Sequence, residues 1–529
     1  MKPRIPATMG TQHPDSASRR VPIQEEPDEA VQMLDPDGLG IEEIMIDFEG
    51  KLTPWHQPWR TAVALKRIGV SPGEDVFITP RLPSAEQESV GRQLMGILAV
   101  LDAIGNGKEL QETPLIHEVV IPMAESGVAL WKVRERVAAL LELLHSEGPT
   151  GLVAEDLYVI PLVESVPQLV VLDQIIEEYV QCNRDAGFDL DTLRVMIARS
   201  DPALRYGMVA ATLSNKVGLS ACYRASERLD IDVAPIWGAG SLPFRGHLTP
   251  DNMDNIVRDF RGLHTITIQS ALRYDHPADR LKELVSKARR ELPTDDHLAY
   301  SDEEVKEILM IIGVFARSYV RTLERLAGSI AAISDLAPRQ RDRLTRDSLA
   351  GYGRSMHDPS ELNRILGEEV SEVAAAPPSA QVNLPRVITF CAATYSMGLP
   401  PEFIGTGRAL RAIEDAMGDA VLDRLLNVYY PSLKDDLAQA HKFMHLDTAK
   451  PLLDSASQRE VETDVQVCHD LFDLNSIPGC APSEYYVSLL ETAEPLLRRA
   501  ANGKGLEERQ AHLAQELIQA MGVSRGSLG

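Results

Sequence analysis

The stretches LYVIPLVES at residues 157–165 and LRVMIARSD at residues 193–201 show the pattern on which the fold depends. Each begins with a short apolar run and ends on polar residues, and a longer segment with helical periodicity lies between them. Near-continuous apolar runs that alternate with helical segments are typical of parallel strands buried on both faces. The two stretches therefore predict one strand-helix-strand unit of a parallel sheet.

The same pattern recurs through the first half of the chain. Eight such runs fall within about 270 residues, which is the number and size expected of a (β/α)8 barrel of about 250 residues. An open doubly wound sheet is the alternative, but no GxGxxG motif follows any run, which disfavours dinucleotide binding. Prolines make the first run the weakest strand. The runs are Arg4–Thr11, Ile41–Phe48, Glu74–Thr79, Glu118–Met123, Leu157–Val163, Leu193–Ala198, Ile231–Trp237 and His264–Ile268.

The chain changes character near residue 276, where long segments with helical periodicity replace the short runs. We therefore expect an α/β protein: a TIM-type (β/α)8 barrel elaborated by many additional helices, with a mainly helical C-terminal half. The expected domains are a barrel at residues 1–275 and a helical region at 276–529 packed on the barrel. Helices are expected at Asp279–Glu291, Asp302–Ile333, Pro359–Val373, Ser432–Phe443 and Leu506–Met521, the last ending at Gly522.

Charge and composition exclude several classes of protein. With 53 Lys and Arg against 78 Asp and Glu, the net charge is −25, so no nucleic-acid partner is expected. The longest apolar stretch, Ile308–Ala316, is less than half of the roughly 20 residues that a membrane span requires. The N-terminal residues lack the apolar segment of a secretory signal. A cytoplasmic location with reduced thiols is expected, since the five cysteines are scattered: Cys182, Cys222, Cys391, Cys468 and Cys480.

Acidic residues follow two neighbouring strands of the predicted barrel. Catalytic groups of such barrels project from the C-terminal ends of the strands, and Glu164 and Asp201 each come directly after an apolar run. Their carboxylates could converge on one hard cation, because Mg²⁺ and Mn²⁺ prefer oxygen ligands. A helix cap or an ion pair is the alternative role for Glu164. An Asp-Pro helix start is the alternative for Asp201.

One histidine and several arginines complete the candidate site. His13 lies in a Pro-flanked loop, where a lone histidine is more often structural, but its ordinary pKa suits it to accept a proton near neutral pH. Arg81, Arg245, Arg354 and Arg386 lie in segments rich in Gly and Pro, where their forks could bind an anion. A single arginine in such a segment is more often a solvated surface residue than an anion-binding one. Together they would form a cationic pocket in an acidic protein.

Eight motifs along the chain, taken in order, resemble the archaeal-type phosphoenolpyruvate carboxylases, the short form of that enzyme. The similarity extends from residue 11 to the last residues and is specific as a set. The motifs are TQHPD at 11–15, DFEGK at 47–51, ITPRLP at 78–83, IPLVES at 160–165, ARSDPAL at 198–204, GAGSLPFRG at 238–246, GYGR at 351–354 and LPRVITFCAATYSMGLPPEFIGTGRAL at 384–410.

The resemblance implies an activity and a set of roles. It implies irreversible carboxylation of phosphoenolpyruvate with bicarbonate to oxaloacetate and phosphate, through carboxyphosphate and a metal-bound enolate. It also implies Mg²⁺ or Mn²⁺ as cofactor, a homotetramer, and active-site arginines contributed by the helical region. The implied metal ligands are Glu164 and Asp201, the implied catalytic residues are His13, Arg245 and Arg386, and the implied substrate-binding residues are Arg81, Arg354, Arg273 and Gly240.

Two departures from the longer form of the enzyme and two other readings stay open. The longer form has a lysine shortly after its metal-binding aspartate and more basic residues in its glycine loop, so Arg205 and Arg273 are the candidate replacements. Another metal-dependent barrel lyase or transferase acting on a pyruvate enolate is the alternative enzyme, and bicarbonate dependence separates the two. A helical assembly protein on an inactive barrel is disfavoured, because the strand-end carboxylates, histidine and arginines are present.

Overall fold

Eight parallel strands close into a barrel in the computed structural model, which describes residues 4–147, 152–153, 157–294, 296–344 and 384–529. Each strand pairs with the next along the chain, and the first pairs with the last. Each of the eight predicted runs overlaps one strand, so the barrel prediction is confirmed; β3, β6 and β7 extend one or two residues beyond the predicted bounds. The strands are β1 (Thr8–Thr11), β2 (Glu43–Asp47), β3 (Phe77–Arg81), β4 (Glu118–Ile121), β5 (Tyr158–Val163), β6 (Thr192–Ala198), β7 (Asp232–Gly238) and β8 (Thr265–Ile268).

The barrel interior is filled by side chains and is not a channel. Because successive side chains of a strand point to opposite faces, alternate residues meet on the barrel axis. The cluster that they form is separate from the larger core between the strands and the surrounding helices. Its members are Met9, Met45, Val120, Ile160, Leu162, Met196, Ala198 and Ile236.

A buried ion cluster closes the N-terminal end of the barrel. Arg194 of β6 contacts Glu43 of β2 and Glu118 of β4, each at 2.7 Å between a guanidinium nitrogen and a carboxylate oxygen. The same guanidinium also donates to the hydroxyl of Thr265 at 3.3 Å. Four strands, β2, β4, β6 and β8, are therefore tied together at the end opposite to the expected site.

Helices, joined by loops and turns, surround the barrel and follow it in the described chain. The barrel helices are α1 (Glu26–Leu34), α2 (Gln57–Arg67), α3 (Val90–Gly107), α4 (Gly127–Glu147), α5 (Val166–Val170), α6 (Leu172–Asp185), α7 (Ser200–Tyr206), α8 (Met208–Leu229), α9 (Met253–Asp259) and α10 (Ser270–Tyr274). The later helices are α11 (Ala278–Glu291), α12 (Asp302–Ser334), α15 (Val387–Ser396), α16 (Thr406–Met417), α17 (Asp419–Arg424), α18 (Leu433–His441), α19 (Leu446–Ala449), α20 (Ser455–Phe472), α21 (Glu484–Ala501) and α22 (Glu508–Arg525). Short turns are η2 (Pro243–Arg245), η3 (Pro250–Asn252), η5 (Pro401–Phe403), η6 (Leu425–Tyr429), η7 (Lys450–Leu452) and η8 (Leu474–Ser476).

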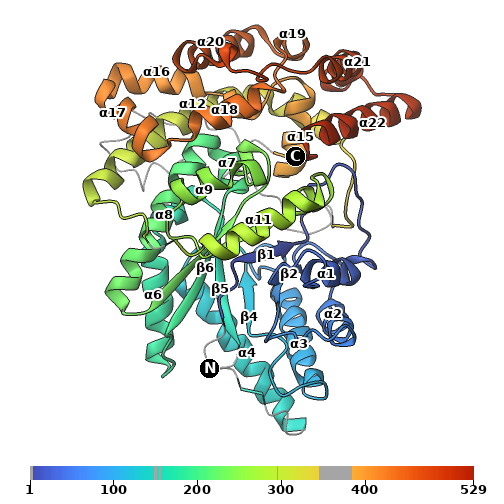
Figure 1. Ribbon diagram of the computed structural model, residues 1–529, viewed down its shortest axis with the longest axis vertical. Coiled ribbons are helices and arrows are strands. Elements are labelled where there is room, and N and C mark those ends of the chain that lie inside the picture. The colour runs from blue at the N-terminus through green and yellow to red at the C-terminus, as the bar shows by residue number, and fades with distance from the viewer. Residues whose placement is uncertain (1–3, 148–151, 154–156, 295, 345–383) are drawn as a thin grey trace.

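The C-terminal helices gather over one end of the barrel (Figure 1). Helices α12 and α15 both contact α7, the helix that follows β6. Buried apolar side chains from the barrel helices and from the C-terminal helices belong to one continuous cluster. The division into domains at residues 1–275 and 276–529 stays a prediction. None of the described helices combines the length and the apolar character that a membrane crossing requires.

The helix predictions for the second half are confirmed in the described residues, with one error at a helix end. Helix α22 does not end at Gly522 but continues to Arg525, and Gly526 adopts the left-handed conformation at φ +73°. Gly522 is buried inside the helix, where an added Cβ would lie 2.8 Å from the Cβ of Ala17, so its small size serves close packing. The helix predicted at Pro359–Val373 lies outside the described residues.

Replacing Arg194 should destabilise the barrel. Arg194→Met leaves the carboxylates of Glu43 and Glu118 buried without a cation, which should lower the free energy of unfolding by about 3–5 kcal/mol. Urea unfolding of the variant and the wild type measures the loss. Arg280→Ala, which removes an exposed arginine paired with Asp251 and Glu283, is the control and should change the midpoint little. Equal effects of the two substitutions would contradict the structural role of Arg194.

Candidate active site

A cavity of about 110 Å³ opens at the C-terminal end of the barrel strands. Five residues that the sequence predicts for the site line it together: His13, Arg81, Glu164, Asp201 and Arg386. Four of them follow or end barrel strands, and Arg386 lies just before α15 of the helical half. The other described lining residues are Pro14, Glu49, Leu162, Met196, Ala198, Ser200, Gly238, Gln269, Arg343, Val387 and Ile388.

Two carboxylates of this cavity, Glu164 and Asp201, are suited to a divalent cation. Glu164 directly follows β5, and the helix-cap alternative for it is not realised, because the Ser165 side chain caps α5 instead. Asp201 lies in the first turn of α7 and precedes Pro202, so the helix-start reading of Asp201 holds as well. No group of three or more His, Cys, Asp or Glu side chains in the described residues could hold a metal. A cation held by this pair therefore has positions left for water or substrate.

Arg81 is held firmly at the mouth of the barrel by carboxylates. Its Nε and Nη2 donate to the two oxygens of Asp47 at 2.9 and 2.8 Å, and Nη1 lies 3.0 Å from Glu49. Nη1 also lies 4.0 Å from Glu164. Burial opposes the charge, but the Asp47 and Glu49 carboxylates outweigh it and raise the pKa of Arg81 well above its ordinary value. The guanidinium group of Arg81 therefore stays charged, and its orientation is fixed.

Arg343 also lines the cavity, and the sequence analysis missed it. It follows α12 and forms an ion pair with Asp47, while its Nη2 donates to the backbone carbonyl of Gln12 at 3.3 Å. Two residues earlier, Arg341 contacts Glu29 at 2.5 Å. Alternating arginines in the stretch RQRDR were the available signal, since side chains two residues apart share a face of an extended segment.

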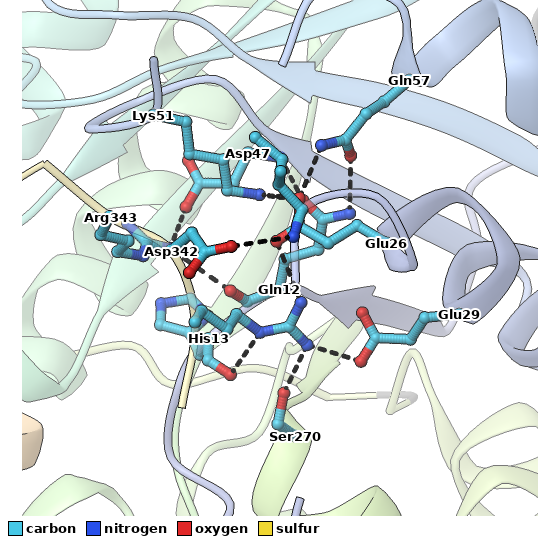
Figure 2. Close-up of polar contacts among 12 residues, drawn as sticks. Gln12, His13, Glu26, Glu29, Asp47, Lys51, Gln57, Ser270, Asp342 and Arg343 are labelled. Atoms are coloured by element: carbon cyan, nitrogen blue, oxygen red, sulfur yellow. Dashed lines mark hydrogen bonds and ion pairs between the residues drawn. The ribbon is translucent and has the colours of Figure 1, made fainter. Parts of the chain in front are cut away.

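A buried polar network supports the loop that carries His13. Lys51 Nζ lies 2.7 Å from Glu26 Oε2 and donates to Gln12 Oε1 at 2.6 Å, and Gln57 donates to Glu26 at 2.6 Å (Figure 2). Burial lowers the pKa of Lys51 to about 8, although the Glu26 carboxylate opposes the shift. The network fixes Gln12 and hence the backbone next to His13.

His13 lies among positive charges and is electrically neutral. Its Nδ1 shares a hydrogen bond of 2.8 Å with the Thr11 hydroxyl. Burial first, and then the positive charges of Arg81 and Arg343, lower the pKa of His13 well below 6.5. A neutral imidazole is the form that can accept a proton.

Three residues predicted for substrate or catalysis are absent from the described lining of the cavity. Arg245 is buried behind it, with Nε 3.1 Å from Ser200 Oγ and Nη2 2.6 Å from Gln269 Oε1. Gly240 packs against the guanidinium of Arg245, where an added Cβ would lie 2.9 Å from Cζ.

Arg273 is the third of these residues and clamps the backbone at the ends of β1 and β8. It donates to the carbonyls of Thr11 and Ile268, each at 2.8 Å, and pairs with Glu29 at 2.8 Å. The substrate-binding roles predicted for Arg273 and Gly240 stay predictions without a contact to the cavity. Arg354 lies outside the described residues.

Arg205, the other candidate replacement for a basic residue, lies in a smaller neighbouring cavity. That cavity is also lined by Glu164, Ser165 and Gln168. Glu164 lines both cavities, so Arg205 shares a cavity with one of the proposed metal-binding residues.

The sequence as a whole matches one family of enzymes. A family model described as phosphoenolpyruvate carboxylase matches residues 5–529. The chain belongs to the phosphoenolpyruvate carboxylase family. This membership decides against the alternative of another metal-dependent barrel enzyme acting on a pyruvate enolate.

Individual relatives agree with the family match over essentially their whole length. The phosphoenolpyruvate carboxylase of Methanopyrus kandleri is 39% identical over 538 residues, and that of Methanosarcina barkeri is 38% identical over 529 residues, each alignment covering 99% of both chains. The enzyme of Metallosphaera sedula is 29% identical over 559 residues and is covered completely. Among solved structures, a Haloferax volcanii malate synthase aligns with 81% of this chain and 100% of its own at 13% identity and a TM-score of 0.37, too weak to support an argument.

The protonation of His13 can be measured in the free protein. Because its pKa is lowered, we expect the imidazole to titrate below pH 6.5 and to be neutral throughout the neutral range. Histidine-selective ¹³C NMR, with the resonance assigned through His13→Gln, follows the titration. Arg343→Gln removes one nearby positive charge and should raise the midpoint. A midpoint at or above 6.5 in the wild type would contradict this electrostatic description.

Proposed function

We propose that this cavity carboxylates phosphoenolpyruvate with bicarbonate and yields oxaloacetate and phosphate. The observation that supports the proposal is that carboxylates, a neutral histidine and arginines line the same cavity. The carboxylates of Glu164 and Asp201 lie with the neutral His13, and the arginines Arg81 and Arg386 line the same space. Membership of the phosphoenolpyruvate carboxylase family indicates which reaction this combination of groups supports.

The first task of the site is to bring two anions together. Phosphoenolpyruvate and bicarbonate repel each other, so the wall must supply positive charge. Arg81, Arg343 and Arg386 do this, and a guanidinium fork matches the oxygens of phosphate and carboxylate. Opposite charges about 4 Å apart attract by roughly 4 kcal/mol at an effective dielectric of about 20. Because Asp47 and Glu49 already hold Arg81, little reorganisation is needed when substrate binds.

Glu164 and Asp201 would hold the divalent cation, Mg²⁺ or Mn²⁺. Both are oxygen donors, both line the cavity, and they come from the ends of adjacent strands. When bound, such a cation supplies Lewis-acid stabilisation of charge on substrate oxygens. The protein holds the pair in place through the start of α5 and the first turn of α7.

His13 would handle the one proton of the reaction. Attack of a bicarbonate oxygen on phosphorus gives carboxyphosphate and the enolate of pyruvate. Neutral His13 would then accept the carboxyl proton through Nε2, the ring nitrogen that does not share the hydrogen bond with Thr11. Loss of that proton breaks carboxyphosphate into phosphate and CO₂, and carbon 3 of the enolate attacks the CO₂. The low pKa of His13 keeps the accepting form available at neutral pH.

Water must be kept from the enolate, because its protonation would waste the phosphate bond. Leu162 and Met196 of the strands and Val387 and Ile388 of α15 form an apolar part of the lining. The helical half therefore contributes both Arg386 and part of the apolar wall. This arrangement favours carboxylation over hydrolysis.

The assembly and the location of the protein are proposed on the family resemblance. The resemblance implies a homotetramer, the scattered cysteines favour a cytoplasmic location, and the net charge of −25 disfavours a nucleic-acid partner. Sedimentation velocity measures the assembly directly. The proposed domains, a barrel at 1–275 that carries the metal-binding residues and a helical region at 276–529, agree with a site built from both parts.

Bicarbonate dependence tests the proposed reaction. With purified protein, phosphoenolpyruvate and Mg²⁺, phosphate release should require bicarbonate, and oxaloacetate should form in equal amount. Asp201→Asn should reduce both products by at least about a hundredfold, since it removes charge needed by the cation. Arg280→Ala, an exposed substitution, is the matched control and should leave both rates unchanged. Phosphate release without bicarbonate, or without oxaloacetate, would contradict the proposal.

A further inference from the structure

The stretch LPPEFIG at residues 399–405 contains a buried carboxyl that the mechanism above does not use. Glu402 lies in η5 and is completely buried. Its Oε1 accepts hydrogen bonds from the backbone N–H of Phe244 at 2.8 Å and from the Tyr395 hydroxyl at 2.6 Å. One oxygen of Glu402 thus joins the glycine-rich loop of the barrel to α15 of the helical half.

The surroundings of the other oxygen, Oε2, indicate whether the Glu402 carboxyl is ionised or neutral. Oε2 is buried without a hydrogen-bond partner, and no Lys, Arg or His of the described chain forms an ion pair with Glu402. A buried carboxylate without a cation is costly, so the neutral acid is favoured. Burial raises the pKa of Glu402 to about 7, although the hydrogen bonds from Tyr395 and Phe244 oppose the shift.

Charged groups surround Glu402, but none of the ion pairs in the described chain includes its carboxyl. Arg408 of α16 and Asp464 of α20 pair with each other at 2.9 Å and so do not serve it. The titratable and charged groups that interact with the carboxyl are Tyr395 and Cys391 of α15, Tyr319 of α12, Asp436 of α18 and Arg199 at the end of β6.

The hydrogen bond to Phe244 matters because of the next residue. Phe244 and Arg245 belong to the three-residue turn η2, and Arg245 extends from it to Ser200 at 3.1 Å and Gln269 at 2.6 Å. Both of those partners line the active-site cavity. A shift of the turn would therefore move the wall of the cavity next to Asp201.

We propose that Glu402 is a positioning residue: by accepting the N–H of Phe244 inside the core, it fixes the turn that directs Arg245 at the cavity wall. The proposal rests on the proposed carboxylation for its kinetic test. What the site needs from Glu402 is an acceptor oxygen at one point, not a negative charge. Gln can supply that oxygen, whereas Asp is too short to reach it and Met has none.

Three variants of Glu402 distinguish the need for a hydrogen-bond acceptor from the need for a negative charge. Glu402→Gln should keep kcat/KM for phosphoenolpyruvate within about threefold of wild type, while Glu402→Asp and Glu402→Met should lower it about ten- to a hundredfold by displacing the turn. Tyr395→Phe is the matched control, because it removes the second bond to Oε1 and leaves Phe244 in place. It should stay within about threefold. Should Glu402→Met fail to fold, the contrast of Gln with Asp still decides.

A stability measurement tests the neutral form without any assay. The folded pKa of about 7 lies above the ordinary value of 4.5, so the folded state keeps a proton that the unfolded state releases. The stability of wild type relative to Glu402→Gln should therefore fall as pH rises from 4.5 through about 7 and then level off. A constant difference would overturn the neutral acid and with it the claim that the site needs no negative charge from Glu402.

Crystal structures test the positioning role of Glu402 independently of the proposed carboxylation. If wild type shows no bicarbonate-dependent reaction, the carboxylation is refuted, and the position of Arg245 decides the role of Glu402. Glu402→Asp should release Arg245 from Ser200 and Gln269, and Glu402→Gln should not. Arg245 unmoved in Glu402→Asp, or full activity of Glu402→Asp and Glu402→Met, would overturn the positioning role.

Discussion

The ion pairs of Asp47 with Arg81 and Arg343 are the interaction on which the mouth of the barrel depends. Asp47 ends β2, Arg81 ends β3, and Arg343 comes from the segment after α12. Burial opposes ionisation of Asp47, but the two guanidinium groups outweigh it and lower the pKa of Asp47 far below its ordinary value. One permanent negative charge therefore joins the barrel to the helical half and holds two cations beside His13, where burial first and these cations second lower the pKa of the imidazole.

The fold could be predicted because its signals are local. Runs such as LYVIPLV are apolar on both faces, which only a strand buried between a filled barrel and a helical layer requires. The rule that function lies at strand ends then placed Glu164, Asp201, His13 and Arg81 in one cavity. Arg81 is the last residue of β3, which explains why it lines the cavity.

The remaining features of the site depend on tertiary contacts that no local pattern carries. Arg343 reaches the cavity from far along the chain, and its partner Asp47 is 296 residues away. Arg273 is an arginine like Arg343, but it donates to backbone carbonyls instead. The closed barrel sets the positions of those carbonyls. Gly522 was mistaken for a helix stop, because a glycine needed for close packing against Ala17 has the same sequence signature as one at a helix end.

The most direct test of the account is the location of a divalent cation in the crystallised protein. Crystals grown with Mn²⁺ and measured for anomalous scattering should show one peak bridging Glu164 and Asp201, with Mn–O distances of about 2.1 Å. That result would establish the shared cation on which the proposed chemistry relies. A peak at another site, or Mn²⁺ bound to only one of the two carboxylates, would contradict it.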